Sequence, residues 1–503
     1  VNAGNSIASG GNYNVFIGDE AGTALTTGDN NVAVGFEALS TEDGNGHNTA
    51  IGYRALKTLN AGSTGLNTAV GKDAGMSSTT ATYNTLIGAR AGDAIQDGGF
   101  NTVVGADAGT ELTSGTNNVF VGREAGKNTT TAIKNVAIGE QALKTNVDGD
   151  GNVAVGYESL KTLEPSDGLS YNTAVGYQAG LSTTTGVKNT IVGSLAGDAL
   201  TIGENNVAIG YNALGSDDVG SRNVAIGWDA LQAQNAPSGS VNNYYNTAVG
   251  ANSGASITTG YYNTFVGGLA GDGTDDGLYN TAFGYLALSA NCGNSNTGIG
   301  TSALENTTGA NNTALGLDAG INVSSGSNNI CIGKDAGVTG SPGGNITTGS
   351  NEIALGDENI SSFSCQVSLT ATSDERDKTD FKDLDLGLDF VKALKPVTYV
   401  WDKRTNYVDN TDPDWRKTLD LDKITSDGSK KDDDLQVGFK AQDVIALEEA
   451  AGYKLSDKTN LTASITSDEK QYGLKYERFV PILVKAVQEL SAKNDALEAR
   501  IKK

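Results

Sequence analysis

Ser373 and Lys378 are the residues whose types and spacing best allow chemistry on the chain itself. A serine hydroxyl is a weak nucleophile until a base takes its proton, and a lysine with a lowered pKa can act as that base. Such a Ser-Lys dyad needs no histidine. Taken alone, a serine and a lysine five residues apart are more typical of a solvated charged turn, so the surrounding elements must decide between the two.

The sequence contains few of the residues that other catalytic mechanisms require. There is one histidine, His47, and there are three scattered cysteines, Cys292, Cys331 and Cys365. A single histidine excludes Ser-His-Asp, Cys-His and histidine-metal mechanisms unless another copy of the chain supplies the same residue. Cysteines without a CxxC spacing predict neither a zinc site nor a disulfide framework. We therefore expect no metal and no cofactor, and at most a serine protease activity on the chain itself.

The charge and hydropathy of the chain limit the classes of partner that it is expected to bind. The formal net charge of -24 argues against nucleic acid and anionic membranes. No apolar run reaches the ~18–20 residues of a membrane span, so membrane insertion is not expected.

Residues 1–357 are built from a short repeat. We count 20 copies of a five-residue core, Asn-x-x-(Val/Ile)-Gly, with most steps 17 residues long. The copies are assigned to Asn14, Asn31, Asn48, Asn67, Asn84, Asn101, Asn118, Asn135, Asn152, Asn172, Asn189, Asn206, Asn223, Asn246, Asn263, Asn280, Asn296, Asn312, Asn329 and Asn351. A period this regular predicts a stack of small units that cannot fold alone.

The residue types within the repeat indicate a β-solenoid. β-Branched and apolar residues after each Asn predict a short strand, and apolar residues on both sides of it predict burial on both faces. The Gly that ends the core marks a sharp corner or a close approach of another backbone. A recurring Asn can form a hydrogen-bonded ladder. Units of this length with this much glycine cannot hold two helices, which excludes an α-solenoid.

Longer steps in the repeat mark inserted loops, which in solenoids lie on the surface and often on the binding face. The step from Asn223 to Asn246 ends with Tyr244 and Tyr245, and Tyr261 and Tyr262 stand at the same place in the next unit. Exposed tyrosines suit a lectin-like contact, so these four are the candidate receptor contacts. The alternative is that they cover the rod or pack between subunits.

The composition changes near residue 373. Of the 130 residues in 374–503, 50 are charged, and this segment contains only 5 of the 67 glycines. We expect a shaft over 1–357, a linker over 358–372 and a different, smaller α+β domain over 373–503.

The end of this domain carries a heptad. Val480, Val487, Asn494 and Ile501 stand at the a positions, and Leu483, Leu490 and Leu497 at the d positions. This pattern predicts a coiled coil over 480–503, in which Asn494 would fix register. β-Branched a residues with Leu at d lean toward a parallel dimer.

The shaft resembles the β-roll heads of trimeric autotransporter adhesins, whose repeats carry a similar Asn-x-Ala-(Ile/Val)-Gly core but are typically shorter. Similar Asn-Thr-Ala-Val-Gly repeats occur in phage tail fibres. The resemblance covers about 340 residues and implies a mainly β homotrimer of parallel β-rolls. We therefore expect a trimer, against the preference of the heptad for a dimer.

The segment Ser373-Asp374-x-Arg376-x-Lys378 resembles the start of the intramolecular chaperone of phage tailspikes, the peptidase S74 family. Two later segments fit in order and spacing: Gly438–Val444 and the Tyr476–Leu483 entry into a final coiled coil. The resemblance implies that the domain trimerises, templates folding of the shaft and is released by self-cleavage. Ser373 would be the nucleophile and Lys378 its base, with Asp374 and Arg376 shaping the site.

These features together predict a trimeric phage tail fibre in the virion tail that attaches to a host. Its expected partners are two further copies of the chain, a cell-surface glycan or protein receptor, and other tail proteins at its N-terminal end. A bacterial adhesin or injection-system fibre with the same module is the alternative. A glycan depolymerase is disfavoured because carboxylates such as Glu37 and Asp73 follow the repeat and are expected to face solvent.

Overall fold

The computed structural model describes residues 2–62, 64–165, 168–235, 242–366, 371, 373–408 and 419–502. The chain forms two compact units, Val1–Ser302 and Ala303–Lys503. The first consists of solenoid turns, and the second contains the last solenoid turns and the C-terminal domain. Part of the expected linker 358–372 lies outside the described residues.

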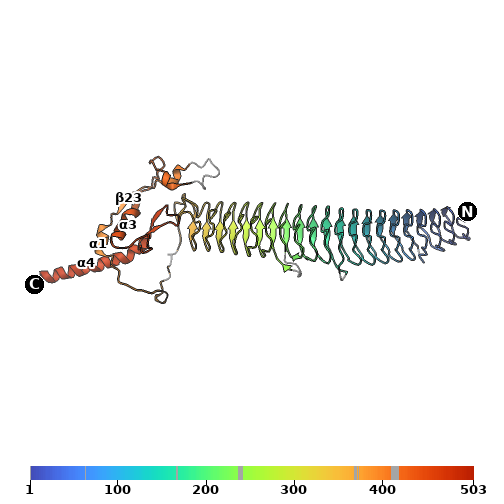
Figure 1. Ribbon diagram of the computed structural model, residues 1–503, viewed down its shortest axis with the longest axis horizontal. Coiled ribbons are helices and arrows are strands. Elements are labelled where there is room, and N and C mark those ends of the chain that lie inside the picture. The colour runs from blue at the N-terminus through green and yellow to red at the C-terminus, as the bar shows by residue number, and fades with distance from the viewer. Residues whose placement is uncertain are drawn as a thin grey trace. The chain divides into compact units, whose positions relative to one another are not determined.

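The expected β-solenoid is confirmed. Twenty three-residue strands form one sheet, in which consecutive turns pair in parallel, with Val15 opposite Val32 and Thr68 opposite Thr85. In the first unit the strands stack in chain order (Figure 1). The first unit holds β1 (Val15–Ile17), β2 (Val32–Val34), β3 (Thr49–Ile51), β4 (Thr68–Val70), β5 (Thr85–Ile87), β6 (Thr102–Val104), β7 (Val119–Val121), β8 (Val136–Ile138), β9 (Val153–Val155), β10 (Thr173–Val175), β11 (Thr190–Val192), β12 (Val207–Ile209), β14 (Val224–Ile226), β16 (Thr247–Val249), β17 (Thr264–Val266), β18 (Thr281–Phe283) and β19 (Thr297–Ile299). The second unit adds β20 (Thr313–Leu315), β21 (Ile330–Ile332) and β22 (Ile353–Leu355).

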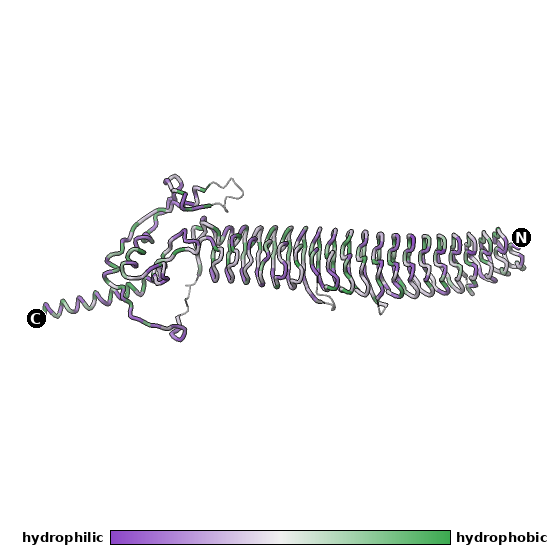
Figure 2. Tube along the Cα trace, viewed as in Figure 1, coloured by the Kyte–Doolittle hydropathy of each residue, from purple (hydrophilic) through white to green (hydrophobic). Residues whose placement is uncertain are grey.

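The strands are buried on one face only. From β2 onward the middle residue of each of these strands is buried, as are Ala50 and Phe120, while its two neighbours are half-buried or exposed. Figure 2 shows apolar residues recurring in every turn of the first unit. The prediction of strands buried on both faces is therefore wrong for the single chain, because a three-residue strand turns two of its side chains outward.

The Gly that ends the core is needed both for a sharp corner and for the close approach of the next turn, as the sequence predicts. Gly267 has φ +135°, a region that side chains disfavour, and a Cβ on it would lie 2.5 Å from the carbonyl oxygen of Gly284 in the next turn. Gly105 is equivalent, with φ +143° and a distance of 2.3 Å to the Gly122 oxygen. Consecutive turns therefore approach each other more closely than any side chain allows.

The expected asparagine ladder is also present. From Asn14 to Asn280, the Oδ1 of each repeat Asn accepts the backbone N–H of the equivalent residue in the next turn, at 2.8–3.2 Å. The last step corrects our count: Asn329 Oδ1 accepts from Glu352 N at 3.0 Å, so Glu352, and not Asn351, occupies the final ladder position. Ile330 pairs with Ile353 in the same register.

The insertion before Asn246 adds a second, small sheet. Its strands are β13 (Gly220–Ser221) and β15 (Asn242–Asn243), which pair in parallel.

The C-terminal domain is the expected small α+β fold. Its helices are α1 (Leu388–Ala393), α3 (Ala441–Ala450) and α4 (Phe479–Ile501), with single 3-10 turns η1 (Glu375–Asp377), η2 (Arg404–Tyr407), η3 (Leu421–Lys423) and η4 (Tyr476–Arg478). Two antiparallel pairs join β23 (Val397–Tyr399) to β24 (Gln436–Gly438) and β25 (Ala463–Ile465) to β26 (Tyr472–Leu474). The core of the domain brings together Leu386, Phe390, Val444, Phe479 and Ile482.

Candidate functional site

The one-turn helix η1 brings Ser373 and Lys378 together. Asp374 caps the turn by accepting from Arg376 N at 2.9 Å, and Lys378 N donates to the Glu375 carbonyl at 3.1 Å. The chain therefore folds back, and Lys378 Nζ lies 2.5 Å from Ser373 Oγ and 3.3 Å from the Ser373 carbonyl oxygen. This is hydrogen-bond distance, as a base that activates a hydroxyl requires.

Asp374 and Arg376 form a two-pronged ion pair beside the dyad. Arg376 Nε donates to both carboxylate oxygens at 3.0 and 3.2 Å, and Nη2 donates to Oδ2 at 2.6 Å. This pair lowers the pKa of the Asp374 carboxyl and raises that of Arg376. The two side chains satisfy each other and hold the turn, which fits a shaping role.

The surroundings of the dyad are open. Ser373 and Lys378 are both exposed in the single chain. A lysine becomes a base at neutral pH when its surroundings disfavour the cation, most often by excluding water. The single chain thus supplies the geometry for proton transfer but not the shielding from solvent.

The heptad residues occupy the face of α4 that the domain does not use. Phe479, Ile482 and Ala486 are buried against the domain. The apolar heptad residues on the other face are each at least 46% exposed: Val480, Leu483, Val487, Leu490, Leu497 and Ile501. Asn494 is exposed as well. α4 therefore has two apolar faces, one covered within the chain and one uncovered.

Three of the tyrosines near the insertion form a stacked column. The rings of Tyr245 and Tyr262 are 5.6 Å apart and those of Tyr262 and Tyr279 are 5.3 Å apart, both nearly parallel. The Arg222 guanidinium lies over Tyr245, 5.5 Å from its ring centre. The three rings remain about half exposed, at 44–55%.

The remaining two candidates pack differently from one another. Tyr244 is only 6% exposed and packs with Val219, and burial raises the pKa of its hydroxyl. Tyr261 is partly buried against the same pair and meets Tyr244 edge to face. Tyr244 is therefore not itself an open contact, and it reaches the column only through Tyr261, which meets Tyr262 edge to face. Our reading of the sequence missed Tyr279, although it directly precedes the repeat Asn280 just as Tyr245 precedes Asn246.

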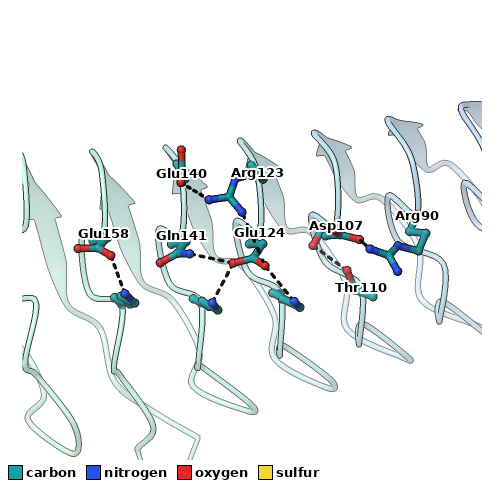
Figure 3. A network of polar contacts seen from close by, with 11 residues as sticks. Arg90, Asp107, Thr110, Arg123, Glu124, Glu140, Gln141 and Glu158 are labelled. Carbon is teal, nitrogen blue, oxygen red and sulfur yellow. Dashed lines mark hydrogen bonds and ion pairs between the residues drawn. The ribbon is translucent and has the colours of Figure 1, made fainter.

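Several carboxylates along the first unit form ion pairs with cations and are not simply solvated as expected, and some of these pairs join neighbouring turns. Asp73 pairs with the adjacent Lys72 at 3.5 Å. Glu37 accepts from Arg54 at 3.0 Å and from Lys57 at 2.7 Å. Figure 3 shows one such network, in which Gln141 donates to Glu124. Lys127 and Lys144 also form ion pairs with Glu124. The hydrogen bonds from Lys144, which has the larger effect, and from Lys127 lower the pKa of Glu124 to about 2.

The cysteines and the single histidine were not expected to take part in catalysis or metal binding. Cys331 is buried in β21, and burial raises the pKa of its thiol and that of Cys292 to about 11, so both are poor nucleophiles. His47 is exposed, with Asn30 Nδ2 3.4 Å from its Nε2. Among the described residues there is no cluster of histidine, cysteine and acidic side chains arranged for a metal.

Comparison with known families finds a match within the C-terminal domain. Residues 373–453 match the Peptidase_S74 family, the chaperone of endosialidase. The match begins at Ser373 and spans the dyad and the Gly438–Val444 segment. A β-solenoid followed by a Peptidase_S74 domain fits a tail fibre with a C-terminal chaperone. No curated protein matches the chain. None of the described helices is both long and apolar enough to span a bilayer.

Proposed function

We propose that the chain is one subunit of a homotrimeric phage tail fibre, in which the Peptidase_S74 domain joins three chains and guides folding of the shaft. The observation that carries this proposal is the uncovered heptad face of α4. Its apolar side chains stand at coiled-coil spacing, while the adjacent face, which carries Phe479 and Ile482, is already used by the domain core.

The outward face of the shaft supports the same assembly. Each strand ends in an outward Val, Ile, Leu or Phe, among them Ile51, Ile138 and Val175 in the first unit, each 36–39% exposed, and Leu315 and Ile332 in the second. A continuous row of this kind on a soluble chain is typical of an interface. Three copies packed around one axis would bury it.

Attachment to a host is the task proposed for the tyrosine column. The rings of Tyr245, Tyr262 and Tyr279 cover one another's faces, so they present their edges and hydroxyls to solvent. Hydroxyls repeated along a rigid shaft suit a ligand rich in hydroxyl groups, such as a cell-surface glycan.

Binding to glycans tests this part. With labelled bacterial capsules and lipopolysaccharides as probes, Tyr262→Ala should weaken binding of a recognised glycan about tenfold, since the middle ring holds its two neighbours. Tyr83→Ala is the matched control, because Tyr83 stacks on Phe100 in another part of the shaft, 4.8 Å apart. Equal losses in both variants would contradict the assignment, and released oligosaccharide would contradict a role in binding alone.

Self-cleavage is the second proposed task, and it rests on the dyad. Lys378 takes the proton of the Ser373 hydroxyl, whose oxygen attacks the carbonyl carbon of an adjoining peptide bond. The amine leaves with a proton returned by Lys378, and water then hydrolyses the ester. Because the dyad is exposed in the single chain, we propose that assembly supplies the missing shielding.

Denaturing electrophoresis tests the cut. The wild-type chain should yield fragments of roughly 373 and 130 residues. Ser373→Ala and Lys378→Ala should leave the chain whole, whereas Thr379→Ala, at the exposed next position, should cut normally. Cutting that persists in Ser373→Ala would show that another residue is the nucleophile.

A further inference from the structure

The turn that joins β25 to β26 lies against the last solenoid turn, within the second compact unit. Asp468 Oδ2 accepts the backbone N–H of Asn345 at 3.0 Å, across 123 residues of sequence. Ser467 Oγ lies 3.3 Å from Glu352 Oε2. A Cβ on Gly344 would lie 2.6 Å from Thr466 Cβ, so the backbone of Gly344 packs closely against the side chain of Thr466.

The hydrogen bond from Asn345 N to Asp468 replaces a bond that the backbone makes between turns elsewhere in the solenoid. In earlier turns, the residue six positions after the core Gly donates its N–H to a carbonyl of the following turn. Ser77 N donates to Asp93 O at 2.8 Å, Asn128 N to Lys144 O at 2.9 Å, and Ser182 N to Asp198 O at 3.0 Å. Asn345 stands in the column of Asn322, whose amide contacts it. No turn follows Asn345, and the Asp468 carboxylate takes the place of the missing carbonyl.

Glu352, at the end of the asparagine ladder, also contacts the β25–β26 turn where the next solenoid turn would otherwise lie. A repeat Asn normally receives the N–H of the next turn and donates to a Gly carbonyl 14 residues on, as Asn84 does to Gly98 at 2.8 Å. After β22 neither partner exists, so an amide here would lose both bonds. A longer, charged side chain instead reaches the hydroxyl of Ser467.

The turn is shaped to offer this acceptor. Asp468 Oδ1 is used within the turn, where it accepts from Thr466 Oγ1 and from Lys470 N at 3.1 Å. Gln471 N donates to Thr466 Oγ1 at 3.1 Å. These bonds fix the carboxylate, and its second oxygen is left to reach the solenoid.

We propose that the β25–β26 turn is the C-terminal cap of the solenoid: Asp468 and Ser467 stand in for the next turn, and the last turn of the shaft folds onto them. The cap makes the open end of the sheet the starting point from which further turns can stack. It acts within one chain and does not require the trimer.

Hydrogen exchange, followed by mass spectrometry on the full chain in a Ser373→Ala background, tests the cap. Asp468→Ala should speed exchange of the amides in 336–356 about tenfold or more, because a hydrogen bond to a charged group is lost. The turns around 100–200 should keep their protection. Asp457→Ala, an exposed aspartate of the same domain, is the matched control, and Asp468→Asn should restore part of the protection because it keeps an acceptor oxygen.

Two outcomes would overturn the proposal: unchanged exchange in 336–356, or equal acceleration along the whole shaft. Should Asp468→Ala fail to fold, Ser467→Ala gives the same test with a smaller expected change. The oligomeric state of each variant is measured in parallel. Faster exchange in a variant that is still trimeric then reports loss of the cap, whereas faster exchange in a variant that has dissociated reports loss of the trimer.

Discussion

In the shaft, hydrogen bonds join residues about 17 positions apart, turn after turn, whereas in the C-terminal domain they join residues that meet only once. Asn101 contacts Asn84 just as Asn118 contacts Asn101. In the domain, Leu388 N donates to Glu489 Oε2 at 2.8 Å across 101 residues, and Tyr453 donates to Asp385 across 68. Contacts of the first kind are strong as a set, but none of them identifies a particular turn.

This difference bears on assembly. Three shafts packed side by side could shift by one turn and still match apolar rows, because each turn resembles the next. A domain with unique contacts can dock in one way only. Joined by α4, three such domains would set the chains in register and raise the local concentration of the shafts.

The largest effect should come from a substitution that spoils the close approach of turns. Gly267→Ala places a Cβ 2.5 Å from the Gly284 oxygen at φ +135°, so we expect a loss of more than about 3 kcal/mol in the stability of the shaft. The neighbouring Gly268 has room, with the nearest atom, in Tyr285, 3.6 Å from the added Cβ. Gly268→Ala should change little. The C-terminal domain should keep its own circular dichroism in both variants.

Thermal unfolding of the two glycine variants measures this contrast. Similar melting temperatures for Gly267→Ala and Gly268→Ala would mean that the turns tolerate wider spacing. The shaft would then be less repetitive in its packing than the ladder implies.

The smallest effect concerns the ion pairs between turns. The pKa of Glu124 falls to about 2 in the folded chain, below its ordinary value of 4.5. A lowered pKa adds stability that is complete above pH ~4.5 and is lost as the pH falls toward about 2. Removing the charge by Glu124→Gln should therefore cost on the order of 1–2 kcal/mol at pH 7 and almost nothing at pH 2.

Unfolding by denaturant at several pH values checks this prediction. Glu111→Gln, at an exposed carboxylate nearby, is the control and should show no such pH dependence. A cost that does not change between pH 7 and pH 2 would show that Glu124 acts by packing and not by charge.

Much of the shaft was predictable because its constraints are local and repeated. The strand, the Gly corner and the Asn ladder each depend on neighbours one period away, so the sequence shows them again in turn after turn. The heptad of α4 was readable for the same reason. The exposure of the outer strand residues was not, because alternation over three residues does not distinguish a covered face from an open one.

Features that occur once were harder to predict. Glu352 was visible as a departure from the repeat, but our count moved it one position out of register. Its partner Ser467 and the contact of Asp468 with Asn345 join segments more than 100 residues apart, and no periodic pattern marks them. At the dyad, the sequence suggested the pair, and only the η1 turn shows how residues 373 and 378 meet.

The central claim is that the uncovered face of α4 assembles three chains, and native mass spectrometry tests it most directly. The wild-type chain should appear as a trimer, and the double variant Val487→Asp/Leu490→Asp should appear as a monomer, because it places charges on the apolar seam. Ala492→Asp, exposed at the heptad position opposite the seam, should remain a trimer. A wild-type chain that is monomeric at micromolar concentration, or a double variant that stays trimeric, would contradict the account.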